Sequence, residues 1–185
     1  PEWERLVERR ESYAVGTVPR GGLFLTAGVD VQEDRLEVEV VAWGRAKESW
    51  SVDYRILEGR TSEQEVWDRL QSLIQDAYPT ACGASLPIAR VFVDSGYRTN
   101  DVYAWVRRQP PAQVAAIKGQ ERGLLPVSQP SAVDVTVGGR KIANGLKIRH
   151  VLGPFFKAEL YAALRLRRPT ADELGSGWMY PWRDP

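Results

Sequence analysis

The sequence predicts an α/β fold in which helices flank a mixed β-sheet, with three antiparallel strands followed by parallel ones. An apolar run that ends at Asp30 is followed, after a polar turn, by residues 35–43, where apolar and polar residues alternate with the period of a half-buried strand. A third run covers residues 49–57, and short turns between all three are typical of an antiparallel meander. A helical pattern at residues 62–78 then permits a crossover to a strand parallel to the first.

The first strand of this meander is expected at residues 23–31. In the third strand, the period of two places four apolar side chains on one face, namely Trp50, Val52, Tyr54 and Ile56. The helix that follows starts with a capping box, Ser62 with Glu65, and ends before Pro79. Its apolar residues recur at helical spacing: Val66, Leu70, Leu73, Ile74 and Ala77.

The second half of the chain alternates strands and helices. Residues 87–94 form a short apolar run that predicts a buried strand, and a helix capped by Thr99 or Asn100 follows and stops at Pro110. Residues 113–118 predict a fifth strand, and residues 119–131 have the composition of turns.

The last part of the predicted domain begins with a hairpin. Residues 134–151 resemble a hairpin around Gly138 and Gly139 followed by a further strand, LKIRHV. Gly153 opens a helix to about Arg168, whose apolar side carries Phe156, Leu160, Tyr161 and Leu164. The tail is rich in glycine, tryptophan and proline, and we expect Trp178 and Trp182 to face a partner while most other tryptophans lie in the core.

Composition limits the chemistry that is open to the chain. Its 185 residues fit one domain, and no apolar run approaches the roughly 20 residues that span a bilayer. A single cysteine excludes an internal disulfide and a thiolate zinc cluster. A single histidine, His150, argues against a His-based metal site or a Ser-His-Asp triad, and we expect a structural role for it. Carboxylates are therefore the expected metal ligands, and they favour Mg²⁺ or Mn²⁺ over zinc.

Charge is distributed unevenly along the chain. Residues 30–76 contain twelve acidic and six basic side chains, whereas residues 140–168 contain eight basic side chains and a single acidic one, Glu159. Such asymmetry is compatible with a polyanionic partner. Solvated helix faces have the same appearance, so both interpretations stay open.

Two aspartates end two of the predicted strands. Asp30 ends the first and Asp94 the fourth. If these strands pair directly, both carboxylates lie at the carboxyl ends of neighbouring strands, where α/β sheets place ligands. This order of elements is that of the ribonuclease H-like fold. Two divalent ions about 3.5–4 Å apart would bridge the carboxylates and promote phosphodiester hydrolysis. Taken alone, Asp30 is also a common kind of turn residue.

Three sequence blocks carry a family resemblance: GVDVQEDRLEVEVVAWG at residues 28–44, VDSGYRTNDVYAWV at residues 93–106, and AIKG at residues 116–119. They resemble the nuclease domain of bacteriophage terminase large subunits, in the lambda-like branch, over roughly residues 20–185. The resemblance implies a metal-dependent endonuclease that cuts concatemeric double-stranded viral DNA during packaging, with Asp30 and Asp94 as matching metal ligands.

The resemblance also implies partners and a location. These are the terminase small subunit, the portal protein and an ATPase motor domain on the same full-length polypeptide, in the cytoplasm of the infected host. No membrane association is expected. The chain lacks a G-x-x-x-x-G-K-[ST] phosphate loop, so the motor would lie outside it.

The chain departs from the family in a second way. The third acidic ligand, in an Asn-Glu-x-x-Asp segment near the family's carboxyl end, is absent, and Asp172, Glu173 and Asp184 are weak substitutes in turn-rich sequence. Because the chain also begins with Pro1, we expect a piece of a longer polypeptide. Its expected divisions are a linker at residues 1–20 and a nuclease domain at residues 21–185, truncated at its carboxyl end.

Basic residues are candidate contacts to DNA. Arg98 follows Asp94 closely, and Lys118 ends the fifth strand, where it is either beside the site or simply solvated. Arg165, Arg167 and Arg168 would grip the DNA backbone or form a solvated helix end.

Two other functions remain open from the sequence. One is a non-catalytic DNA-binding or docking module of the same fold. The other is a nuclease of the resolvase or transposase type, which would prefer branched DNA to a linear duplex.

Overall fold

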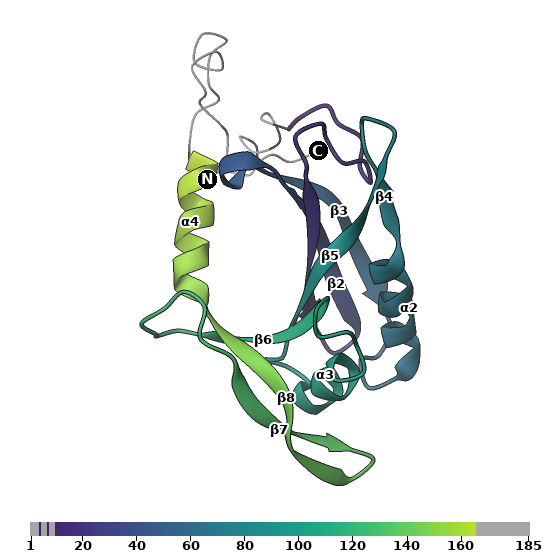
Figure 1. Cartoon of the computed structure of the whole chain (residues 1–185), viewed down its shortest axis with the longest axis vertical. Helices are drawn as coiled ribbons and strands as arrows, with labels where there is room; N and C mark the ends of the chain where they lie inside the picture. The colour runs from purple at the N-terminus through teal and green to yellow at the C-terminus, as the bar shows by residue number, and fades with distance from the viewer. Residues whose placement is uncertain (1–3, 5–6, 8–9, 166–185) are drawn as a thin grey trace.

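The predicted meander forms one half of an eight-stranded sheet in the computed structural model, which describes residues 4, 7 and 10–165 (Figure 1). Strand β1 covers Phe24–Val31, β2 covers Arg35–Trp43 and β3 covers Ser49–Glu58, and each pairs antiparallel with the next. A short 3₁₀ turn, η1, covers Arg45–Lys47. All three predicted strands are confirmed to within one residue at each end.

Beyond β1, the strands β5, β6 and β8 run parallel to it, whereas β7 and β4 are antiparallel to their neighbours. The strand order is β3-β2-β1-β5-β6-β8-β7, and β5 pairs parallel with β1 on one side and with β6 on the other. The remaining elements are α2 (Gln64–Gln75), β4 (Ala77–Pro79), β5 (Ser85–Asp94), α3 (Thr99–Val106), β6 (Val114–Gln120), β7 (Ser131–Val137), β8 (Arg140–Leu152) and α4 (Gly153–Arg165). A meander followed by parallel strands across helices is the ribonuclease H-like arrangement, so the predicted fold class is confirmed.

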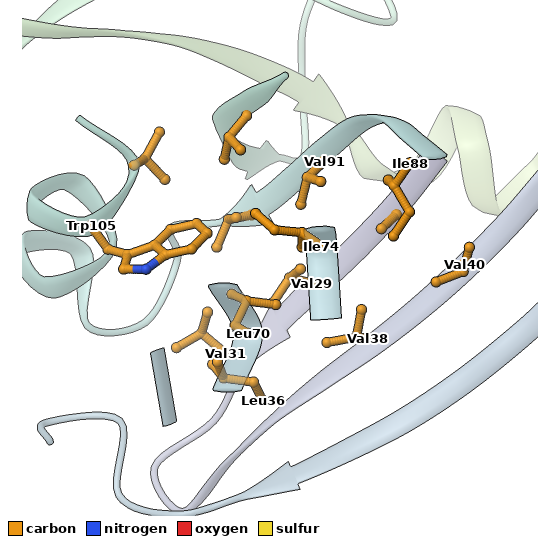
Figure 2. Close-up of a cluster of buried hydrophobic side chains, with 14 of the residues drawn as sticks. Val29, Val31, Leu36, Val38, Val40, Leu70, Ile74, Ile88, Val91 and Trp105 are labelled. Atoms are coloured by element: carbon orange, nitrogen blue, oxygen red, sulfur yellow. The ribbon is translucent and has the colours of Figure 1, made fainter. Parts of the chain in front are cut away.

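The hydrophobic core lies on one face of this sheet, beneath α2 and α3 (Figure 2). Alternate residues of the central strands, such as Val29 and Val38, are buried there against Leu70 and Ile74 of α2. Trp105 of α3 joins them, with its ring centroid 5.5 Å from that of Trp67. The intervening residues of the strands face the other side, which we call the open face.

A β-bulge in β3 overturns one expectation. Val40 pairs with Asp53 but Val41 pairs with Ser51, so Val52 is an extra residue in the ladder. Beyond an extra residue the side-chain alternation reverses. Trp50 is therefore buried in the core, whereas Tyr54 and Ile56 are about half exposed on the open face. The prediction that Trp50, Val52, Tyr54 and Ile56 share one face is wrong.

The capping box predicted for α2 is also wrong. The N-cap is Glu63, one residue after Ser62, and it makes no capping hydrogen bond through its side chain. Thr61 explains the delay, because its hydroxyl donates to the carbonyl oxygen of Gln32 at 2.7 Å and its own carbonyl accepts from the indole of Trp67 at 3.0 Å. The first contact ties the turn to the β1–β2 loop and the second ties it to α2, so the helix begins after Thr61.

Helix α2 ends earlier than its periodicity suggested. It stops at Gln75, and Ala77–Pro79 form β4, which pairs antiparallel with the start of β5. The residue before a proline is biased toward extended backbone, so Pro79 forces Tyr78 out of the helix. The cap predicted for α3 differs as well. Arg98 is the N-cap in a left-handed conformation, and the Thr99 hydroxyl donates to the carbonyl oxygen of Ser95 at 2.8 Å instead.

The predicted hairpin is confirmed around Gly138 and Gly139, which both have positive φ, as a tight two-residue turn requires. Its second strand, β8, continues unbroken to Leu152 and includes the segment that we expected as a separate strand. Helix α4 follows and stands away from the rest of the sheet in Figure 1. None of its residues is buried, and Glu159 forms an ion pair with Lys47 at 3.3 Å.

Part of the expected linker contacts the sheet. Val18 is fully buried in the core, and the hydroxyl of Tyr13 donates to the carbonyl oxygen of Ser51 at 2.8 Å. No helix within the described ranges is long and apolar enough to cross a membrane.

Candidate active site

Asp30 and Asp94 lie side by side at the carboxyl ends of two neighbouring parallel strands. The ladder between β1 and β5 pairs Val29 with Val93, and each aspartate is the next residue of its strand. Because Val29 and Val93 are buried in the core, alternation directs both aspartates to the open face. Neighbouring strands lie about 4.8 Å apart, so the two carboxylates are within reach of one ligand.

Local hydrogen bonds orient both carboxylates without neutralising them. The side-chain amide of Gln32 donates to Oδ2 of Asp30, and the backbone N–H of Gly96 donates to Oδ1 of Asp94 at 3.2 Å. Neither aspartate forms an ion pair with a residue that the structure describes. Two adjacent carboxylates without a cation repel each other, so the site favours a positively charged ligand.

The turn after Asp94 is fixed to the neighbouring strand. Ser95 is fully buried, and both its backbone N–H and its hydroxyl donate to the carbonyl oxygen of Ile117, at 2.8 and 2.7 Å. Ile117 is itself the register partner of Asp94. The backbone of β6 therefore fixes the residue directly after the second aspartate.

Two further carboxylates share this face, and we did not identify them as site residues from the sequence. Glu37 is the register partner of Asp30, and Glu39 is the register partner of Gly28. The sequence did contain a signal for them, because both glutamates are among the polar residues of the alternating second strand, on the face away from the core. Only the register between β1 and β2, however, places Glu37 opposite Asp30.

Glu37 is held in its ionised form. Hydrogen bonds from the Tyr54 hydroxyl and from Nε of Arg35, the latter at 2.7 Å, lower the pKa of Glu37 below its ordinary value. The same contact with Glu37 raises the pKa of the Tyr54 hydroxyl. Glu39 accepts a hydrogen bond from the Ser51 hydroxyl at 3.0 Å. The surroundings of Asp30 are thus anionic at neutral pH.

These residues line a hollow of about 320 Å³ on the open face. Its wall includes all four carboxylates together with Tyr54, Phe92 and Ile117. An all-oxygen donor set suits a hard cation such as Mg²⁺ or Mn²⁺. Asp30 and Asp94 fit one such ion, but within the described part of the chain no three acidic, histidine or cysteine residues cluster closely enough to complete a metal site.

None of the other predicted site residues that the structure describes lines this hollow. Arg98 caps α3 four residues after Asp94, and its Nη1 lies 3.6 Å from Oδ2 of Asp101. Lys118 follows Ile117 in β6 and pairs with His150, so alternation directs it to the face opposite Asp94. Arg165 is the last residue of α4.

Several expectations fall on residues outside the part of the chain that the structure describes. They concern Arg167, Arg168, the tryptophans Trp178 and Trp182, and the acidic residues Asp172, Glu173 and Asp184.

Comparisons with known proteins agree with the blocks found in the sequence. The model of the family described as "Terminase large subunit gpA, endonuclease domain" matches residues 1–180. The terminase large subunit of Escherichia phage lambda is 30% identical over 174 residues, which cover 94% of this chain and 26% of that protein. The terminase large subunit of Enterobacteria phage P21 is 28% identical over 184 residues, covering 94% of this chain and 28% of that protein.

The chain therefore spans only about a quarter of the length of these curated relatives. No solved structure matches it significantly. Because the family match extends over nearly the whole chain and includes both strand-end aspartates, this chain belongs to the family of terminase large subunit gpA endonuclease domains.

Proposed function

We propose that this chain is a metal-dependent endonuclease that hydrolyses phosphodiester bonds of double-stranded viral DNA during genome packaging. The observation that carries the proposal is the pair formed by the exposed Asp30 and the half-buried Asp94 on adjacent parallel strands, neither of which has an ion-pair partner among the described residues. Membership of the gpA endonuclease family supports the reaction class.

Asp30 and Asp94 would hold the divalent metal, with one or two Mg²⁺ or Mn²⁺ ions in the complete site. Bound there, such ions supply Lewis-acid stabilisation of the phosphate and of the leaving oxygen, and they activate water. Gln32 and the backbone of Gly96 keep the two carboxylates aimed at the open face. Glu37 is ionised but paired with Arg35, so the negative potential that would attract a cation comes mainly from the two aspartates.

Double-stranded DNA is the proposed substrate, and basic side chains are its proposed contacts. Arg98 lies closest to Asp94 along the chain, and Arg165 with Arg167 and Arg168 would contact the backbone from α4 and beyond. Lys118 remains a weaker candidate, because its strand directs it away from the aspartates.

The rest of the packaging machinery belongs to this proposal as well. The curated relatives are named terminase large subunits and are about four times longer than the matched region. We propose that an ATPase motor lies elsewhere on the full polypeptide, that the small subunit and the portal protein are partners, and that the protein acts in the host cytoplasm. The boundary between a linker and the nuclease domain near residue 20 is likewise proposed.

A second candidate is a DNA-binding module that does not cut. The absence of a third clustered carboxylate from the described residues favours this alternative. A resolvase or transposase type of nuclease is separable by substrate, because it would cut branched junctions in preference to linear duplex.

The test is cleavage of supercoiled plasmid DNA by the chain with Mg²⁺ or Mn²⁺, with and without a chelator. We expect Asp30→Asn and Asp94→Asn each to abolish cleavage, since the loss of either carboxylate removes a ligand while the core stays intact. Glu65→Gln is the matched control, because it neutralises an exposed carboxylate on α2, on the far side of the sheet. Normal cleavage by Asp30→Asn would refute the assignment of the site.

A further inference from the structure

A second hollow lies next to the acidic one and has the opposite charge. Its volume is about 660 Å³, and four basic side chains line it: Arg90, Arg107, Lys147 and Arg149. Of the described residues that line it, none is acidic. Three separate elements, β5, the end of α3 and β8, bring these cations together.

The hollow exists because two strands of the sheet diverge. Strand β8 pairs with β6 only from Ile117 to Gln120, so the first half of β6 has no partner on that side. Residues at the end of α3, where Arg107 is the C-cap, form another wall of the hollow. Lys147 and Arg149 both face the gap because they are two residues apart on β8, on either side of the buried Ile148.

No carboxylate compensates the charge of the four cations. All four side chains are exposed, and none forms an ion pair with a described residue. Arg90 donates to the carbonyl oxygen of Pro111 at 3.3 Å and Arg149 to that of Ser128 at 3.0 Å, which leaves their charge in place. Several uncompensated cations around one hollow attract an anion with more than one charged group.

Strand β5 links the basic hollow to the acidic one. Its open face carries Arg90, Phe92 and Asp94 at alternate positions, and Phe92 lines both hollows. A strand rises about 3.3 Å per residue, so Arg90 and Asp94 lie about 13 Å apart along the strand. Phe92 lies between them on the same face, and this separation is too long for the two charges to pair.

We propose that the basic hollow binds backbone phosphates of the same DNA whose phosphodiester bond is positioned at Asp30 and Asp94. The inference rests on the proposed function, because it assigns the hollow to the substrate of that site. A distance of about 13 Å corresponds to about four base pairs of duplex at about 3.4 Å each. The hollow thus contacts phosphates within about four base pairs of the cut.

The test uses Arg107 and Lys147, because neither side chain has a hydrogen-bond or ion-pair partner among the described residues. Binding of a fluorescent duplex is measured by anisotropy, with chelator present to prevent cleavage, over a series of salt concentrations. We expect the double variant R107A/K147A to bind severalfold more weakly, and the slope of log affinity against log salt to fall by about 2. The charge-conserving R107K/K147R should retain the wild-type slope.

The matched control is R20A/R69A, which removes two exposed arginines that lie before β1 and on α2. Its slope should equal that of the wild type. With plasmid substrate and metal, R107A/K147A should raise KM more than it lowers kcat. An unchanged slope in R107A/K147A, or an equal loss in R20A/R69A, would overturn the proposal.

The two proposals fail separately. If Asp30→Asn abolishes cleavage but R107A/K147A binds DNA like the wild type, the nuclease assignment stands and the basic hollow is not the phosphate site. If R107A/K147A loses affinity and salt dependence but the wild type never cuts, the hollow binds DNA and the proposed nuclease activity falls.

Discussion

Asp53 is a carboxylate buried in β3, and hydrogen bonds from two neighbouring side chains offset the cost of burying its charge. The Tyr78 hydroxyl donates to its Oδ2 at 3.0 Å, and Nε of Arg55 donates to the same oxygen at 2.8 Å. Burial and the nearby charge of Asp53 raise the pKa of Tyr78 well above its ordinary value. This contact connects β4 to β3 and helps to retain the short strand that the sequence did not reveal.

The raised pKa of Tyr78 makes stability depend on alkaline pH. Below about pH 10, the tyrosine is protonated in both states and its contribution is complete. Above about pH 10, the unfolded chain loses this proton and the folded chain keeps it, so the free energy of unfolding falls by up to about 1.4 kcal/mol per pH unit. Tyr78→Phe should make this fall shallower.

Urea unfolding of both proteins at pH 7, 10 and 11 measures this effect. At pH 7 the variant should be less stable by about 1–3 kcal/mol, because Asp53 loses a buried donor. Tyr161→Phe, at a half-exposed position on α4, is the control. It should change neither the stability at pH 7 nor the loss of stability above pH 10. If the wild type and Tyr78→Phe lost the same stability between pH 7 and pH 11, Tyr78 would not be the cause of the loss.

At the scale of elements, Trp50 illustrates how closely the β2–β3 connection is packed. A side-chain carbon built on Gly44 would lie 2.8 Å from the carbonyl oxygen of Gly21 and 2.9 Å from the Trp50 ring. Gly44→Ala should therefore lower the free energy of unfolding by about 1–3 kcal/mol through overpacking. Denaturant unfolding checks this value.

Gly119→Ala in β6 is the matched substitution, since nothing lies within 4 Å of its added carbon. It should leave stability unchanged or slightly raised. Equal losses in the two variants would show that backbone freedom, and not the contact with Trp50, decides the effect.

The strands and helices also show which features could be predicted from the sequence and which could not. Alternation in the first two strands and the apolar run before Asp94 were sufficient to predict both strand ends. The helix between them only permitted a parallel strand, and the structure supplies the direct pairing. The bulge at Val52 was not predictable, because every residue near it suits a strand on either face. Strand β4 was hidden because Ala77 fits the helical period of α2. The basic hollow depends on where β6 and β8 diverge, a long-range property that no local pattern encodes.

At the scale of the whole molecule, the metal binding that we propose predicts a link to folding. A ligand that binds only the folded chain stabilises it by about 1.4 kcal/mol at a concentration ten times its Kd. We expect Mn²⁺ to raise the Tm of the wild type and to leave that of Asp30→Asn unchanged. Without metal, Asp30→Asn should be at least as stable as the wild type, because it removes repulsion from Asp94.

Thermal unfolding over a Mn²⁺ series gives both results in one experiment, and Glu65→Gln should shift like the wild type. Mg²⁺ should shift the wild-type Tm less, because it dehydrates reluctantly and requires near-octahedral geometry that two carboxylates alone do not provide. A full Mn²⁺ shift in Asp30→Asn would place the ion elsewhere.

The one-sided core has an evolutionary consequence. In the central strands, one set of alternate residues maintains the fold and the other set meets the ligand, so mutations in the two sets are under different selection. A lineage can lose Asp30 or Arg90 and still inherit a folded domain, whereas substitutions at Val29 or Val38 are removed because the protein no longer folds. Descendants of such a domain are therefore expected to drift in chemistry much faster than in architecture.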